Sequence, residues 1–147
     1  MSAHTQCITG VSAVAIEGRA LMIEGSPGSG KSSLALALID RGAALIGDDG
    51  VELLHEGGQV IVRPPPRIAG LLEIRGVGLV QFPPHEGAPL ALILTLATPE
   101  DAPRLPETLD RRDLLGLAIP VLTFSPGSIA PGLRAEWAMR THGLAYA

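Results

Sequence analysis

The chain has 147 residues, of which 46% are hydrophobic and 18% charged, and its formal net charge is −4 at pH 7. This length and apolar content predict one domain, residues 1–147, with a sizeable core. The pI near 5.5 argues against a general nucleic-acid binder, because such proteins carry excess Lys and Arg. The longest apolar stretch, 90–97, is too short to cross a bilayer, and the first residues lack a signal-peptide pattern. With Cys7 as the only cysteine, we expect a cytoplasmic protein without a membrane anchor.

The first predicted elements are a hairpin and a helix. Val11–Glu17 and Ala20–Glu24 flank the turn Gly18-Arg19, which is typical of two antiparallel strands. The apolar run that follows, 32–39, predicts a helix, and Gly42 supplies a suitable C-terminal cap.

Between this hairpin and this helix lies the run GSPGSGKS, which satisfies the spacing G-x-x-x-x-G-K-[ST] of a phosphate-binding P-loop. Lys31 is the only lysine in the chain, so its ammonium is expected to serve phosphate chemistry rather than solubility. An ordinary glycine-rich turn is the alternative, and the flanking strand and helix favour the P-loop. The residues expected to line the nucleotide site are Gly25, Ser26, Pro27, Gly28, Ser29, Gly30, Lys31, Ser32 and Ser33.

The remainder of the chain is richer in strand patterns than in helix patterns. The expected strands and the closing helix are, in chain order, 44–46, 51–54, 59–63, 71–80, 90–96, 121–124 and the helix 133–141. This order predicts an α/β fold with a mixed sheet, a P-loop at one strand end, and more hairpins than a doubly wound parallel sheet carries.

Three groups of charged residues have competing interpretations. Asp48 and Asp49 follow the strand 44–46 and could simply begin a turn, but the nearby P-loop favours a catalytic role. Glu73 alternates with apolar residues and could face solvent on a strand. The cluster 110–113, which contains Arg111 and Arg112, is interpreted as a solvated group of charges.

Three segments together resemble the C-terminal catalytic domain of HPr kinase/phosphorylase, which phosphorylates a serine of the phosphocarrier protein HPr. They are GSPGSGKS, the run LALALIDRGAALIGDD ending at Asp49, and LLEIRGVGLV from Leu71 to Val80. The resemblance covers about half the chain and is to the short, single-domain form. It implies the PEP carboxykinase-like fold of that family and a ring-like hexamer.

The resemblance also implies site roles. ATP would occupy the P-loop, Lys31 would draw charge from its phosphates, and Mg²⁺ would bind Ser32 and Glu73. Asp49 would be the base for the protein serine, with Asp48 tuning its acidity or assisting the metal. Arg104 falls where the family has a catalytic arginine.

Two departures from the family pattern keep alternatives open. The family's catalytic histidine before the P-loop lands on Gly10 here, and His4 lies six residues earlier. The C-terminal Gly-Arg-Asn segment linked to reverse phosphorolysis appears as 125–132 without its arginine. The main expectation is a serine protein kinase acting on HPr. The alternatives are a catalytically reduced ATP-binding regulatory protein and a P-loop kinase of a small molecule.

Overall fold

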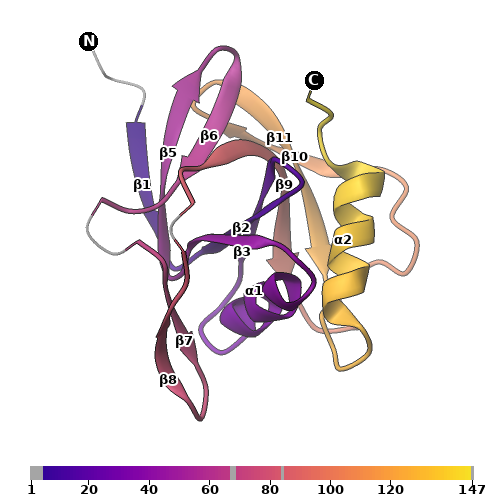
Figure 1. The fold of residues 1–147 in the computed structure, drawn as a ribbon. Coiled ribbons are helices and arrows are strands. Elements are labelled where there is room, and N and C mark those ends of the chain that lie inside the picture. Colours follow the sequence, from indigo (N-terminus) through magenta and orange to yellow (C-terminus); the bar gives the residue numbers. More distant parts are fainter. Residues whose placement is uncertain (1–4, 67–68, 84, 147) are drawn as a thin grey trace.

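The computed structural model describes residues 5–66, 69–83 and 85–146, which form eleven strands and two helices (Figure 1). In chain order these elements are β1 (Thr5–Thr9), β2 (Ser12–Ile16), β3 (Arg19–Glu24), α1 (Lys31–Asp40), β4 (Ala44–Gly47), β5 (Gly50–Glu56), β6 (Gln59–Arg63), β7 (Leu71–Ile74), β8 (Gly78–Gln81), β9 (Ala88–Leu96), β10 (Asp110–Leu114), β11 (Leu117–Phe124) and α2 (Pro131–His142). His4 lies outside the described residues.

The predicted hairpins and both predicted helices are confirmed. β2 pairs with β3, and β5 with β6, each pair antiparallel. The single strand expected over 71–80 is wrong: the segment is the antiparallel hairpin β7–β8, because Gly76, with a φ of 83°, turns the chain and the N–H of Val77 bonds the carbonyl of Ile74. Helix α1 ends where expected, because Gly42 adopts a φ of 107° that suits glycine and its N–H bonds the carbonyl of Ile39. The sequence patterns missed β1 and β10. Both are largely exposed strands that lack the apolar alternation used to find the others.

The main sheet is mixed and has nine strands. Its order is β1-β5-β6-β9-β3-β2-β4, and β11 joins β9 while β10 joins β11. Strands β3, β9 and β11 are parallel. Since β2 is antiparallel to both β3 and β4, β4 also runs in this direction. The carboxyl ends of these four strands therefore meet at one edge of the sheet, where α/β proteins commonly bind ligands.

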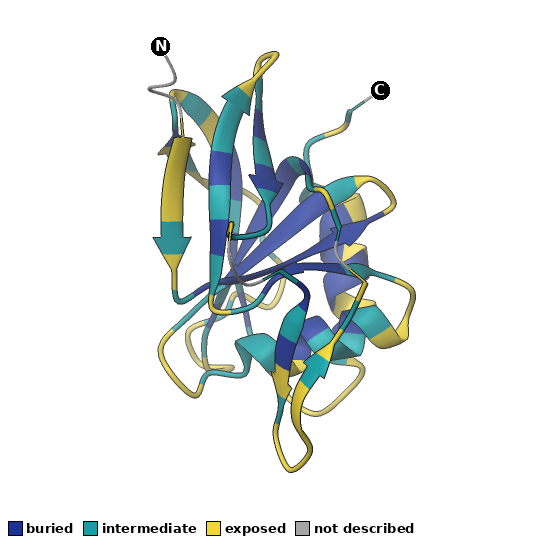
Figure 2. Cartoon of the chain, turned by 60° about the vertical axis from the view of Figure 1, so that its left-hand side comes forward, coloured by how far each residue is buried: buried dark blue, intermediate teal, exposed yellow. Residues whose placement is uncertain are grey.

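The central strands consist mostly of buried residues (Figure 2), and the sheet separates two clusters of buried apolar side chains. One layer joins the sheet to α1 and α2, through Leu34 and Leu38 of α1 and Met139 of α2. The other layer is enclosed where β5 and β6 fold across the opposite face, and it contains Met22 and Ile93 of the central strands. Because β3 and β9 are buried on both faces, they hold the edge that carries the P-loop in a fixed position.

The small β7–β8 sheet lies beside α1 and extends away from the main sheet (Figure 1). Leu72 of β7 is fully buried in the layer next to α1, which attaches the hairpin to the core. Neither helix in the described ranges is long and apolar enough to cross a membrane.

Candidate functional site

The P-loop connects β3 to α1 at the edge where the parallel strands end. Gly28 and Gly30 have φ values of 80° and 104°, and open space surrounds the position of a Cβ on either residue. At Gly25 the constraint is space: a Cβ there would lie 2.5 Å from the Ser29 hydroxyl and 3.2 Å from the Cβ of Leu96. The loop thus turns tightly without side chains covering its backbone N–H groups.

The residues of this loop fit a bound phosphate. The N-terminus of α1 has no side-chain cap and no acidic residue in its first turn, so its free N–H groups and partial positive charge face the loop. The Lys31 ammonium donates to the carbonyls of Gly25 and Ser26, at 2.8 and 3.2 Å. The Ser29 hydroxyl is buried without a hydrogen-bond partner among the described residues. A phosphate in the loop would compete with two backbone carbonyls for the ammonium.

Asp48 connects the end of β4 to the start of α1. Its Oδ1 accepts hydrogen bonds from the Ser32 hydroxyl at 2.7 Å and the Ser12 hydroxyl at 2.8 Å. Within the described part of the chain, Oδ2 accepts no hydrogen bond. A serine hydroxyl and a carboxylate in direct contact are hard oxygen donors of the kind that Mg²⁺ prefers. The fit of this pair to a metal is therefore good.

Asp49 occupies the turn between β4 and β5. It is exposed and has a φ of 62°, a left-handed conformation that is uncommon outside glycine but tolerated by Asp and Asn. Its carbonyl accepts the N–H of Gly10 at 3.0 Å, which ties this turn to the β1–β2 turn. Its side chain forms no hydrogen bond or ion pair with the described residues. The carboxylate is thus available at the same edge as the P-loop.

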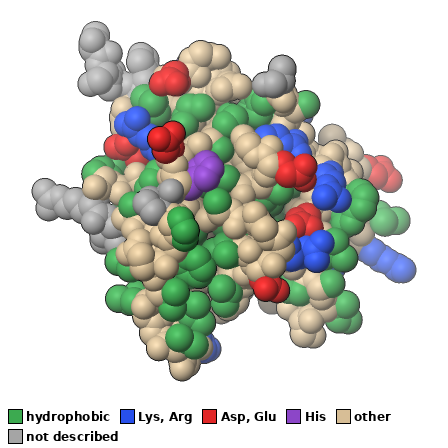
Figure 3. Space-filling view, viewed as in Figure 1, with side chains coloured by type: hydrophobic (Ala, Val, Ile, Leu, Met, Phe, Trp, Pro, Cys, Tyr) green, Lys and Arg blue, Asp and Glu red, His purple; other side chains and the backbone are tan. Residues whose placement is uncertain are grey.

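Glu73 lies on the β7–β8 hairpin, beside α1. Glu73 is exposed on β7 and has no hydrogen bond or ion pair within the described ranges. No group of three or more His, Cys, Asp or Glu side chains is close enough to hold a metal among the described residues. Ser32 and Asp48 are therefore brought together, whereas Glu73 is not seen in contact with either. Figure 3 shows hydrophobic side chains gathered at this end of the molecule, where Val77 and Leu79 are more than 70% exposed.

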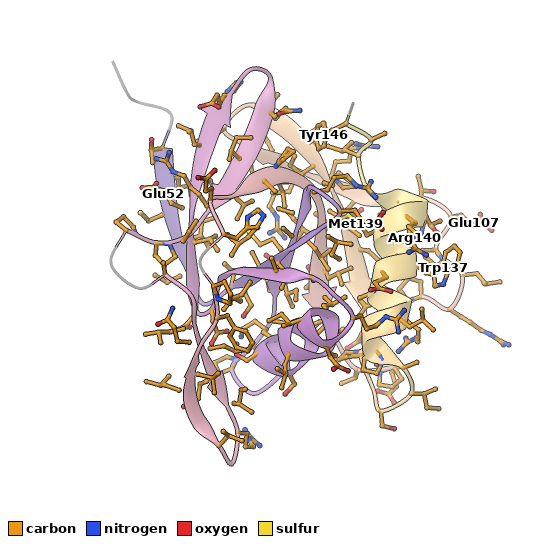
Figure 4. All side chains as sticks on the ribbon, in the orientation of Figure 1. Glu52, Glu107, Trp137, Met139, Arg140 and Tyr146 are labelled. Carbon is orange, nitrogen blue, oxygen red and sulfur yellow. The ribbon has the colours of Figure 1, made fainter. Side chains whose placement is uncertain are left out.

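Arg104 lies in the segment 97–109. This segment follows β9 and therefore begins at the same sheet edge as the P-loop. It is exposed and lines an open cavity of about 1030 Å³. This cavity extends between the segment 97–109, the residues that follow β11, and α2, where Trp137 lies on the outward side of the helix (Figure 4). None of the P-loop residues lines it.

The interpretation of 110–113 as a solvated charge cluster is wrong for Arg112. The Arg112 guanidinium forms a bidentate ion pair with Glu24, the last residue before the P-loop, and its Nη2 lies 2.7 Å from Oε2. The hydroxyl of Thr95 donates to the same Oε2 at 2.6 Å. The hydrogen bonds from Arg112 hold the pKa of Glu24 below its ordinary value; partial burial opposes this shift, and the Thr95 hydrogen bond and the positive charge of Arg112 add to it.

Replacing Glu24 with glutamine is expected to lower the free energy of unfolding at pH 7 by about 1 kcal/mol, a small value because Arg112 is 41% exposed and solvent screens the pair. The folded pKa is depressed, so the stabilisation is present above the ordinary value of 4.5 and is lost as the pH falls through the folded pKa. Urea unfolding of the wild type and of Glu24→Gln from pH 7 to pH 3 measures the difference in their free energies of unfolding. A difference that stays constant over that range would contradict the assignment.

Sequence reasoning missed Ser12 and Glu24, although each left a signal. Ser12 is the one polar residue of the otherwise apolar strand β2. A hydroxyl that is buried with such a strand, as Ser12 is at 1% exposure, requires a partner. Glu24 is a charged residue at the end of a buried strand, which also requires a counter-charge. Their partners lie 36 and 88 residues away in the chain, so no local pattern identifies them.

A family model and several known proteins match this chain. The family described as HPr Serine kinase C-terminal domain matches residues 2–125. HPr kinase/phosphorylase from Burkholderia cenocepacia (strain HI2424) is 36% identical over 118 residues, which are 74% of this chain and 37% of that protein. The protein of the same name from Brevibacillus brevis is 46% identical over 74 residues, or 50% of this chain and 24% of that protein. The chain thus spans well under half the length of these relatives.

A solved structure extends the match to most of the chain. The HPr(Ser) kinase/phosphatase from Coxiella burnetii superimposes with a TM-score of 0.82 and 29% sequence identity, covering 93% of this chain and 95% of that one. The mixed α/β fold expected from the sequence is therefore confirmed. The chain belongs to the HPr serine kinase C-terminal domain family.

Proposed function

We propose that residues 1–147 act as one P-loop kinase domain that transfers the γ-phosphoryl group of ATP to a serine of an HPr-type phosphocarrier protein. The observation that carries this proposal is a group of residues at one sheet edge. The P-loop with Lys31 leads into the uncapped N-terminus of α1, and Asp48 is hydrogen-bonded to Ser32. Family membership supports the identity of the protein substrate. A cytoplasmic location belongs to the same proposal, supported by the free, exposed thiol of Cys7.

The proposed roles follow from where each side chain lies. The P-loop N–H groups and the Lys31 ammonium would hold the phosphates of ATP and draw negative charge toward the leaving oxygen. Ser32 and Asp48 would hold Mg²⁺, and Glu73 remains a proposed further ligand by family resemblance. When bound, Mg²⁺ neutralises charge on the phosphate oxygens.

Asp49 is the proposed general base. Its carboxylate would accept the hydroxyl proton of the substrate serine as the serine oxygen forms a bond to the γ-phosphorus and the bond from that phosphorus to the ADP oxygen breaks. Arg104 would stabilise charge on the transferring group, which requires the segment 97–109 to bring it to the P-loop. Reverse phosphorolysis would use the same groups with the proton returned by Asp49.

The deciding experiment is transfer of γ-labelled phosphate from Mg-ATP to purified HPr from the same organism. The control is an HPr variant whose acceptor serine is replaced by alanine, with ATP binding measured in parallel by calorimetry. Label on wild-type HPr that is missing from the variant supports the proposal. ATP binding without label would instead favour an ATP-binding regulatory protein, or a kinase of a small molecule.

A homo-oligomer, with a hexamer as the form that family resemblance suggests, is part of the proposal. Large apolar side chains that are exposed in one chain support it, because burying them against other copies is favourable. Among the described residues they are Val77, Leu79, Leu105, Ile129, Leu133 and Trp137. Sedimentation equilibrium measures the assembly mass.

A further inference from the structure

Glu24 joins the P-loop to two other parts of the chain. Its backbone leads directly into Gly25, and its carboxylate accepts hydrogen bonds from Thr95 and from both terminal nitrogens of Arg112. We call these three residues, Glu24, Thr95 and Arg112, the Glu24 cluster. Each of its hydrogen bonds has a charged acceptor, and two have a charged donor as well, which makes them strong and directional.

The two partners of Glu24 lie on either side of the segment 97–109. Thr95 is the next-to-last residue of β9, just before the segment, and Arg112 is the third residue of β10, just after it. One carboxylate therefore bonds to both strands that flank the segment containing Arg104, in addition to the pairing of each strand with β11. Inside the segment, the backbone hydrogen bonds that the described residues form gather at its first turn, around Thr98, and Pro103 and Pro106 have no N–H to donate.

We infer that Glu24 is a positioning residue that fixes the segment 97–109, through Thr95 and Arg112, at the sheet edge that carries the P-loop. This inference rests on the phosphoryl transfer proposed above for its effect on rate, but its structural part can be tested separately. The P-loop itself does not depend on the cluster, because β3 is paired with β2 and β9 over its length and the Lys31 contacts lie within the loop. Loss of the cluster should thus release the segment and leave nucleotide binding largely intact.

A second ion pair of similar exposure provides a matched control. Glu52 of β5 and Arg63 of β6 form a cross-strand pair at 2.6 Å, with side-chain exposures of 14% and 40%, compared with 20% and 41% for Glu24 and Arg112. In Figure 4, Glu52 lies beside β1, on the opposite side of the molecule from Glu107 of the segment 97–109. Glu52→Gln therefore removes a comparable charge pair without touching the segment.

The first test measures the segment without any catalysis. Limited trypsin digestion of the full chain is followed at the bond after Arg104, relative to the bond after Arg75, which is exposed on the β7–β8 hairpin and serves as an internal reference. We expect Glu24→Gln to raise the relative cleavage rate after Arg104 about tenfold, and Glu52→Gln to leave it unchanged. An unchanged rate in Glu24→Gln, or an equal rise in both variants, would overturn the inference.

The second test uses steady-state kinetics of transfer to HPr. We expect Glu24→Gln to lower kcat about tenfold with KM for ATP within about twofold of wild type, because the segment is misplaced while the P-loop is not. Thr95→Val should lower kcat in the same direction, and Glu52→Gln should change neither constant. A change in KM for ATP with kcat preserved would overturn the role in positioning the segment. If the wild-type chain transfers no phosphate, the proposed function fails, and the digestion still decides whether Glu24 holds the segment.

Discussion

Lys31→Ala is expected to reduce phosphoryl transfer by about 10³-fold or more and to leave the fold intact. The ammonium is the only positive side chain inside the P-loop, and removing a charged donor that faces developing negative charge typically costs this much in rate. The fold should persist because, in the described part of the chain, the Lys31 ammonium donates hydrogen bonds only to the carbonyls of Gly25 and Ser26 in its own loop. Label transfer to HPr and thermal unfolding measure the two effects.

The control for Lys31→Ala must change net charge by the same amount elsewhere. Arg140→Ala does so on α2, where Arg140 stacks on the Trp137 ring and forms a long ion pair of 3.7 Å with Glu17. Transfer by this variant should equal that of wild type, since surface pairs of this kind contribute little. Substantial transfer by Lys31→Ala would exclude the role assigned to the lysine.

Asp49→Asn is expected to lower kcat for transfer by about 10²- to 10⁴-fold, the range that loss of a general base produces. Asparagine tolerates the left-handed conformation that Asp49 adopts, with φ at 62°, so the turn should keep its shape. ATP binding should change little, because the Asp49 side chain has no hydrogen bond to the P-loop among the described residues. Single-turnover transfer at saturating Mg-ATP, with calorimetry for ATP binding, measures both.

Asp48→Asn separates the two neighbouring acids. Asp48 accepts hydrogen bonds from both Ser12 and Ser32, so its loss should weaken Mg²⁺-dependent ATP binding rather than the proton-transfer step alone.

If Asp49→Asn transfers phosphate at the wild-type rate, Asp49 is not the base, and a nucleotide-sensing role becomes the better explanation of the site.

Several parts of the fold could be predicted because their information is local. The hairpins around Gly18-Arg19 and Gly57-Gly58 depend on turn residues and on apolar strands beside them. The P-loop is contiguous in the chain, and its glycines, lysine and following helix determine its shape within eight residues. The position of Asp48 and Asp49 at the end of a buried strand was also readable for this reason.

Other parts could not be predicted, because they depend on partners far away in the chain. The strand β10 reads as a charged surface segment, and it becomes a strand by pairing with β11 and by the contact of Arg112 with Glu24. The strand β1 is similar: it is exposed along most of its length and owes its conformation to backbone pairing with β5. Side-chain patterns carry little information about such strands.

The sequence by itself determined the phosphate-binding loop, the order of the main elements and the family, because these depend on short, contiguous patterns. Only the tertiary structure decided which side chains meet. It brought Ser12 and Ser32 onto one oxygen of Asp48, and it joined Glu24 to Arg112 across 88 residues. The physical reason is that the parallel strands end at one sheet edge, and the pairing order of the strands, which no local pattern encodes, selects the residues that share that edge.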